Sequence, residues 1–275
     1  MTPVDVHAVA DGPPDAPVLV LSPSLGCTHA MWDPQVSGLA ELFRVVRYDP
    51  RGHGRSPVPA GPYAIADLAE DVVRLLDRHD VERAHYCGLS LGGMTGIALA
   101  ADHPDRVDRL VLCGTTAQFP PPAPFAERAA TVRAKGTGAI ADTVVERWVT
   151  PGFAAAHPEV VAWLRSMIER TPDEGYAACC DAIERMDLRG ALSRITAPTL
   201  VVGGEQDPVT TPDVVRRIAD AVPGALLEVL SPAAHLANIE QAEALTRLLL
   251  DHLLRDREGY FGSNQENPSR SRNPG

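Results

Sequence analysis

The stretch Cys87-Gly-Leu-Ser-Leu-Gly-Gly93 decides the fold, because it carries the pattern Gly-x-Ser-x-Gly centred on Ser90. It lies between a β-rich run, Ala84 to Gly88, and a segment with helical periodicity, Leu91 to His103. A strand that turns this sharply into a helix needs small residues on both sides of the serine, and Gly88, Gly92 and Gly93 meet this need. The turn would expose the Ser90 hydroxyl beside a helix N-terminus, which favours developing negative charge. Ser90 is therefore the candidate nucleophile.

Short β-rich runs alternate with helical patterns along most of the chain. The other predicted strands are Val18 to Ser22, Arg44 to Tyr48, Arg109 to Cys113, Thr199 to Gly203 and Leu226 to Leu230. The other predicted helices are Ile65 to Asp80, Pro212 to Ala221 and Ala237 to Leu254. This alternation predicts an α/β protein with a mostly parallel sheet covered by helices on both faces. Together with the serine turn, it indicates the α/β-hydrolase fold.

Residues 119–192 break this alternation. The segment opens with Phe119-Pro-Pro-Pro-Ala-Pro124 and continues as several helices without a convincing strand. Ligands of open α/β sheets bind beyond the carboxyl ends of the strands. We therefore interpret 119–192 as a helical lid inserted after the sixth strand, and 1–118 with 193–254 as the hydrolase core. The polar segment 255–275 is expected to be a disordered tail or a linker.

Composition narrows the classes of partner. The chain of 275 residues has 25 basic and 36 acidic side chains, and this net charge of −11 argues against nucleic acid as a partner. The five cysteines show no metal-ligand spacing, so we expect free thiols, no metal and no disulfide. Since no signal peptide and no membrane-length apolar run is visible, we expect a cytoplasmic protein without a membrane partner.

A serine hydroxyl needs a base to become a good nucleophile, and the chain offers nine histidines. His235 follows the last predicted strand across a short loop, where the chain order Ser, Asp, His of this fold places the base. His53 is the main alternative. It lies in the glycine-rich turn Asp49-Pro-Arg-Gly-His-Gly-Arg-Ser56, but it precedes the serine in the chain. We therefore predict His235 as the base and a packing or surface role for the others.

The acid that orients the histidine should follow an earlier strand end. The stretch Thr199-Leu-Val-Val-Gly-Gly-Glu-Gln-Asp-Pro208 offers two carboxylates, Glu205 and Asp207. Asp207 is preferred because Pro208 and the helix that follows would fix its loop, whereas Glu205 lies closer to the strand end. The alternative for Asp207 is a helix-capping or turn aspartate.

An oxyanion hole needs two backbone N–H groups that point at the same atom. Leu91, the residue after the serine, should supply the first N–H. The second should come from the loop after Val18 to Ser22, where Pro23-Ser-Leu-Gly26 makes Leu25 the candidate donor. Gly26 would let this loop approach closely.

The sequence resembles the 3-oxoadipate enol-lactonases of the β-ketoadipate route of aromatic degradation. Three stretches of the resemblance are common to many α/β-hydrolases: Ser22 to Thr28 with Met31 to Gln35, Arg47 to Gly54, and Cys87 to Met94. Two stretches in the lid are more specific, Arg147-Trp-Val-Thr-Pro-Gly-Phe153 and Gly175-Tyr-Ala-Ala-Cys-Cys180. The resemblance extends to about Leu254. Some members of that family are fused to a carboxymuconolactone decarboxylase domain, and we expect no such domain here.

The resemblance implies a cofactor-free hydrolase that opens a small anionic lactone through an acyl-serine. A substrate carboxylate requires a local cation, and Arg128 and Arg133 both border the apolar stripe of one lid helix. Periodicity cannot choose between them, and the resemblance favours Arg128, with Trp148 as an apolar wall and Trp32 as a further substrate contact. The alternatives are an esterase, a C–C bond hydrolase or a perhydrolase with the same triad. A non-catalytic binding relative is disfavoured because no triad residue is missing.

Overall fold

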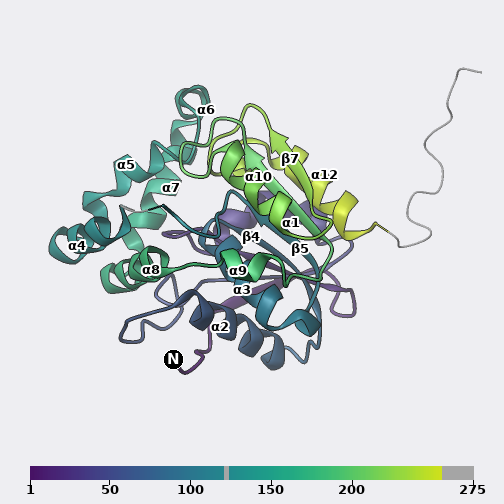
Figure 1. Cartoon of the computed structure of the whole chain (residues 1–275). Coiled ribbons are helices and arrows are strands. Elements are labelled where there is room, and N and C mark those ends of the chain that lie inside the picture. Colours follow the sequence, from purple (N-terminus) through teal and green to yellow (C-terminus); the bar gives the residue numbers. More distant parts are fainter. Residues whose placement is uncertain (121–123, 256–275) are drawn as a thin grey trace, which may run out of the picture.

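A seven-stranded sheet forms the centre of the molecule, whose computed structural model describes residues 1–120 and 124–255 (Figure 1). The strands lie in the order β1-β3-β2-β4-β5-β6-β7. Only β1 and β3 pair antiparallel among the described strands; the remaining pairs are parallel. Their bounds are β1 Ala8–Asp11, β2 Val18–Ser22, β3 Arg44–Tyr48, β4 Ala84–Leu89, β5 Val107–Cys113, β6 Thr199–Gly204 and β7 Leu226–Leu230. The predicted parallel α/β fold is confirmed.

The six predicted strands are present, and the edge strand β1 was not predicted. The central strands read as unbroken apolar runs because helices cover both of their faces; every residue of β4 and β6, for example, is buried. In β1, by contrast, the sequence Ala-Val-Ala-Asp is short and half-exposed. Such an edge strand carries little apolar signal.

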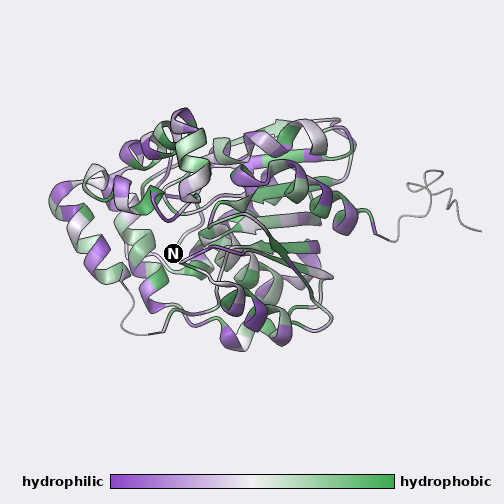
Figure 2. Cartoon of the chain, turned by 90° about the horizontal axis from the view of Figure 1, so that it is seen from above, coloured by the Kyte–Doolittle hydropathy of each residue, from purple (hydrophilic) through white to green (hydrophobic). Residues whose placement is uncertain are grey.

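Helices pack on both faces of the sheet, and their apolar sides face it (Figure 2). On one face α1 (Asp33–Leu39) contacts α12 (Ala242–Leu253), which follows α11 (Ala237–Glu240). On the other face α3 (Leu91–Asp102) packs against α2 (Ile65–Arg78) and α9 (Arg189–Leu192), and α10 (Pro212–Ala221) packs on β6 and β7. Because α3 is buried along all but its last residue, it holds the serine turn rigidly against β4 and β5.

The lid forms the separate group of helices at the left of Figure 1. It contains α4 (Phe125–Lys135), α5 (Ala141–Val145), α6 (Pro151–Ala156), α7 (Pro158–Arg170) and α8 (Asp173–Arg185). The lid follows β5, the fifth strand of this sheet, and not the sixth as predicted. Three strands, β1 to β3, precede β4 in the described chain, and the lid helices begin after the next strand, β5.

One contact between glycines brings the lid against the core. A Cβ atom on Gly175 of α8 would lie 2.1 Å from the carbonyl oxygen of Gly52, which belongs to the glycine-rich turn after β3. Any side chain at position 175 would therefore push α8 away. The tail predicted for 255–275 lies, after Arg255, outside the described residues, and no helix in the described ranges is long and apolar enough to cross a membrane.

Candidate active site

Ser90 stands in the sharp turn that the sequence predicts between β4 and α3. Its backbone has φ +56° and ψ −112°, a conformation that residues with side chains rarely adopt. A Cβ atom on Gly88 would lie 2.1 Å from the carbonyl oxygen of Gly92, and one on Gly92 would lie 2.3 Å from that of Ser22. The two glycines of the motif are therefore sterically required by the turn.

His235 and Asp207 are joined by a hydrogen bond, with 2.8 Å between His235 Nδ1 and Asp207 Oδ2. Both side chains are almost completely buried. Thr210 also donates its hydroxyl to Oδ2, at 2.6 Å, and the backbone N–H groups of Val209 and Thr210 donate to Oδ1. Burial alone would raise the pKa of Asp207, but the charge and hydrogen bond of His235, together with the Thr210 bonds, lower it to about 2. Asp207 is therefore an ionised acceptor for the imidazole.

The two alternatives that the sequence left open have other partners. Glu205 is exposed, and its carboxylate accepts a hydrogen bond from the Ser231 hydroxyl. His53 is completely buried; its Nε2 accepts the backbone N–H of Gly26 at 2.9 Å, and its Nδ1 faces the carbonyl oxygen of Arg51 at 3.1 Å. Burial lowers the pKa of His53 to about 4 and keeps the ring neutral. His53 thus supports the loop that carries Leu25, a role that sequence reasoning missed.

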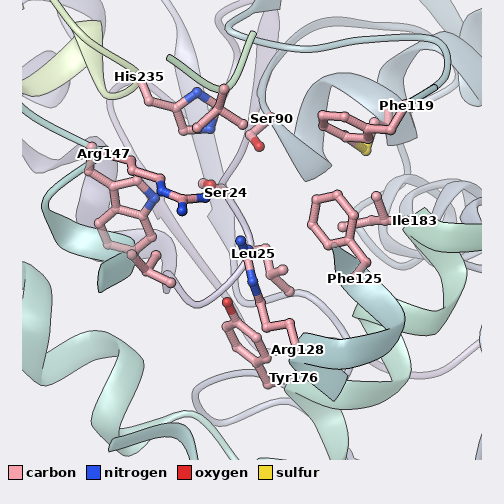
Figure 3. Close-up of a pocket in the computed structure, with 14 residues that line it drawn as sticks. Ser24, Leu25, Ser90, Phe119, Phe125, Arg128, Arg147, Tyr176, Ile183 and His235 are labelled. Atoms are coloured by element: carbon pink, nitrogen blue, oxygen red, sulfur yellow. The ribbon is translucent and has the colours of Figure 1, made fainter. Parts of the chain in front are cut away.

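One pocket collects most of the predicted residues (Figure 3). Ser90 and His235 lie together at one end of it, and the guanidinium groups of Arg128 and Arg147 point into it. Aromatic and aliphatic side chains close the remaining walls. The pocket is lined by Ser24, Leu25, Ser90, Met94, Phe119, Phe125, Arg128, Val144, Arg147, Trp148, Tyr176, Ile183, Val209 and His235.

The structure separates the two lid arginines that periodicity could not distinguish. Arg133 forms hydrogen bonds with Glu174 at 2.9 Å and with Asp181 at 2.7 Å on the outside of the lid, and it does not line the pocket. The prediction that Arg133 contacts substrate is therefore wrong. Arg128 lies over the Phe125 ring at 5.0 Å. Within the described ranges, no carboxylate pairs with Arg128 or with Arg147. Arg147 opens one of the two lid stretches of the resemblance, but it was not predicted as a substrate contact.

Trp32 was also predicted to contact substrate, and this prediction is wrong. The residue ends the short 3₁₀ helix η1 (His29–Trp32) and is completely buried in the hydrophobic core, away from the pocket lining. A large apolar side chain gains most by leaving water, and the core next to α1 provides that environment. Trp148, by contrast, lines the pocket as predicted.

The two proposed oxyanion donors belong to segments that touch. Leu25 lines the pocket, and the backbone N–H of Gly92, next to Leu91, donates to the carbonyl oxygen of Pro23 at 3.1 Å. In the described part of the chain, neither the Leu25 nor the Leu91 N–H donates to a protein acceptor. Both donors are thus available to a ligand oxygen.

Glu240 joins the histidine loop to the lid, and nothing in the sequence pattern indicated this. One oxygen of its carboxylate accepts the backbone N–H of Ala234, and the other accepts the N–H and the hydroxyl of Thr150 at 2.9 and 2.7 Å. The backbone N–H of Leu236 also donates to the carbonyl oxygen of Trp148 at 2.8 Å. The residues on both sides of His235 are therefore fixed to the lid segment that carries Trp148.

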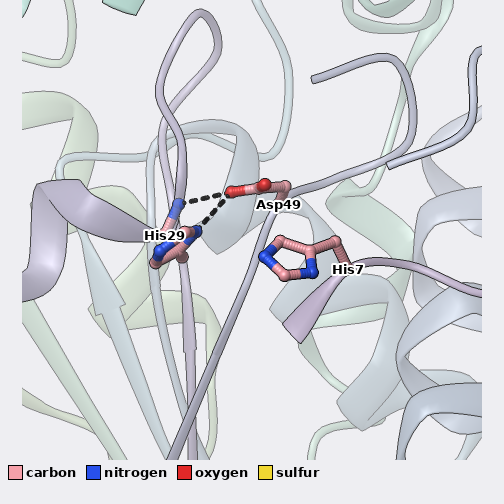
Figure 4. A group of neighbouring side chains, drawn as sticks. All are labelled: His7, His29 and Asp49. Carbon is pink, nitrogen blue, oxygen red and sulfur yellow. Dashed lines mark hydrogen bonds and ion pairs between the residues drawn. The ribbon is translucent and has the colours of Figure 1, made fainter. Parts of the chain in front are cut away.

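Outside the pocket, the side chains of His7, His29 and Asp49 form a group whose ligand atoms lie within 4.8 Å of one another (Figure 4). Asp49 already accepts the N–H and Nδ1 of His29, both at 2.8 Å, and the N–H of Arg55 at 3.0 Å. These bonds hold the glycine-rich turn and satisfy the carboxylate without an ion. The five cysteines are all buried free thiols, as predicted.

Comparison with known proteins places this chain among the α/β-hydrolases. Residues 17–242 match the family model of the alpha/beta hydrolase fold. 3-Oxoadipate enol-lactonase 2 of Acinetobacter baylyi is 40% identical over 233 residues, 85% of this chain and 87% of that protein. The crystal structure of the enol-lactonase from Burkholderia xenovorans LB400 is 44% identical with a TM-score of 0.88, covering 90% of this chain and 96% of that one. A putative carbamate hydrolase RutD of Variovorax paradoxus is 36% identical over 259 residues, 91% of this chain and 96% of that protein.

Proposed function

The chain belongs to the 3-oxoadipate enol-lactonase family of the α/β-hydrolase fold, and from this premise we propose that it hydrolyses 3-oxoadipate enol-lactone to 3-oxoadipate. The observation that carries the proposal is the pocket itself, which joins Ser90 and His235 to two arginines without carboxylate partners in the described chain. In a protein of net charge −11, such a pocket suits a small anionic ester. The reaction belongs to the β-ketoadipate route of aromatic degradation.

In the first half of the reaction, Ser90 Oγ attacks the lactone carbonyl carbon while His235 takes the hydroxyl proton. Asp207 accepts the Nδ1–H of His235 and stabilises the imidazolium that forms. The backbone N–H groups of Leu25 and Leu91 donate to the oxyanion. When the tetrahedral intermediate collapses, the ring C–O bond breaks, His235 returns its proton to the leaving oxygen, and the enol so formed ketonises.

In the second half, His235 activates a water molecule that attacks the acyl-serine. His235 takes a proton from this water and returns it to Ser90 Oγ as the bond between Oγ and the acyl carbon breaks, and the acid product leaves. Neither half of the reaction uses a cofactor. This step must be faster than reclosure of the ring, because the leaving group stays tethered to the acyl chain. The anchoring of the His235 loop to the lid through Glu240 supports this step, since it holds the base in place in both halves.

A second candidate function is hydrolysis of a carbamate, and the similarity to the putative carbamate hydrolase favours it. An esterase for other small substrates would use the same three residues. The two arginines argue for an anionic substrate in either case. Purified protein should be assayed with enol-lactone generated in situ, with carbamate and with a neutral aryl acetate. A kcat/KM for the enol-lactone at least 100-fold above both of the others supports the proposal, and preference for carbamate overturns it.

A further inference from the structure

The hydroxyl group of Tyr176 lacks a hydrogen-bond partner although it is completely buried. The side chain comes from α8, lines the pocket and directs its oxygen into it (Figure 3). Buried polar groups are almost always hydrogen-bonded, because an unmade bond reduces stability. Among the described side chains with such an atom, Tyr176 alone lines the pocket. The Tyr176 hydroxyl is therefore available to an atom of a ligand bound in the pocket.

The neighbouring side chain determines what this ligand atom must be. The guanidinium of Arg128 lies beside the Tyr176 hydroxyl, and it can only donate hydrogen bonds (Figure 3). Burial raises the pKa of Tyr176, so that its oxygen keeps the proton. The Tyr176 oxygen can accept one guanidinium N–H, but the phenol O–H and the other N–H groups of Arg128 have no acceptor among the described residues. A ligand group that accepts from both side chains satisfies these donors.

Both donors are held in place by packing. The Arg128 guanidinium lies over the Phe125 ring, 5.0 Å from its centre. The Tyr176 ring lies against the loop of Leu25, since a Cβ atom on Gly26 would be only 3.0 Å from its Cε2 atom. The Tyr176 hydroxyl is therefore fixed relative to the loop that faces Ser90, and its distance from the reacting carbonyl is fixed with it.

We propose that Tyr176 and Arg128 form a carboxylate-binding subsite, in which the phenol O–H and the guanidinium N–H groups donate to the two oxygens of one substrate carboxylate. A planar carboxylate has acceptors only, and it matches the fork of a guanidinium. The subsite deepens the proposed function and rests on it for the identity of the substrate. It selects lactones and esters that carry an anionic arm and excludes neutral ones of the same size.

Tyr176→Phe in the full-length protein tests the subsite. The variant should lose about ten- to 150-fold in kcat/KM on the enol-lactone, mainly through KM, as expected for a hydrogen bond to a charged group. The loss on a neutral aryl acetate should be at least tenfold smaller. Because the deleted hydroxyl has no protein partner, the melting temperature should not fall. Equal losses on both substrates, or a lower melting temperature with unchanged selectivity, would overturn the subsite.

Tyr63→Phe is the matched control, because the Tyr63 hydroxyl is bonded to the carbonyl oxygen of Pro59 at 2.6 Å away from the pocket. It should lower the melting temperature by about 2–4 °C and keep the ratio of the two activities. Adipate separates the subsite from the proposed function. Should the wild type fail on the enol-lactone yet cleave the aryl acetate, adipate must still inhibit that cleavage and inhibit Tyr176→Phe at least tenfold less. Equal inhibition of both proteins would contradict the subsite.

Discussion

Asp207 Oδ2 lies 2.8 Å from His235 Nδ1 inside the protein, and the same oxygen accepts the Thr210 hydroxyl. With a pKa of about 2, Asp207 is ionised at every pH at which the protein would work, so its charge is available to the imidazolium of the transition state.

Asp207→Asn should therefore reduce kcat by up to about 10⁴-fold, because an asparagine carries no charge and permits the wrong histidine tautomer. Steady-state kinetics on the enol-lactone and on an aryl acetate measure this. Glu205→Gln is the control and should stay within about threefold of wild type, since Glu205 is bonded to Ser231 on the surface. Near-normal activity of Asp207→Asn with a large loss in Glu205→Gln would reverse the assignment of the acid.

Replacing Arg128 should lower activity on anionic substrates much more than activity on neutral ones. Arg128→Met is expected to lower kcat/KM on the enol-lactone by about ten- to 150-fold, which corresponds to a charge-assisted contact of about 1.5–3 kcal/mol. The neutral aryl acetate should be affected much less. Arg133→Met is the control, because its guanidinium is held by Glu174 and Asp181 outside the pocket. Equal effects of the two substitutions would contradict a role for Arg128 in binding.

The sequence predicted the serine turn and the Asp207–His235 pair well, because these depend on local chain geometry at strand ends. It could not separate Arg128 from Arg133, since both border the same apolar stripe. The partners that hold Arg133 outside are Glu174 and Asp181, which lie 41 and 48 residues further along the chain. Tyr176 was missed for the same reason: its unsatisfied hydroxyl is a product of how α8 packs over the pocket. Trp32 was predicted as a substrate contact from the resemblance, yet the core buries it completely.

His53 should make the free energy of unfolding depend on pH. Its pKa is lowered by burial from 6.5 to about 4, so the unfolded chain binds the proton and the native protein does not in this interval. His53 therefore does not lower the free energy of unfolding above pH 6.5, and it lowers this free energy progressively as the pH falls from 6.5 towards 4. His53 should account for about 2 kcal/mol between pH 7 and pH 5.

Urea unfolding at these two pH values checks the His53 prediction. His53→Gln keeps a side-chain acceptor for the Gly26 N–H but cannot titrate, so the difference in stability should shrink by about 2 kcal/mol. His157→Gln, an exposed position between α6 and α7, should keep the wild-type difference. If His53→Gln kept the wild-type pH dependence, protonation of His53 on unfolding would not be its cause.

The contact between Gly175 and Gly52 predicts a strict requirement for glycine in the lid. Gly175→Ala places a methyl group 2.1 Å from a backbone oxygen, which α8 can relieve only by moving. We expect a loss of about 1–3 kcal/mol in unfolding free energy and weaker binding of adipate, because Tyr176 moves with the helix. Gly152→Ala in α6 has no atom within 4 Å of the new methyl and should be neutral or slightly stabilising. Thermal melts that rank the two variants equally would refute the steric account.

The most direct test is the turnover of enol-lactone by wild type and by Ser90→Ala, measured as the loss of the ultraviolet absorbance of the enol-lactone. Both proteins should also be treated with a fluorophosphonate, which labels an active serine. Wild type should open the lactone and be labelled once, and the label should map to Ser90. Ser90→Ala should fold, resist labelling and lose about 10⁴-fold or more in kcat. Contradiction would come from a Ser90→Ala variant that still opens the lactone at the wild-type rate, or from a wild type that is labelled at Ser90 and yet leaves the enol-lactone intact.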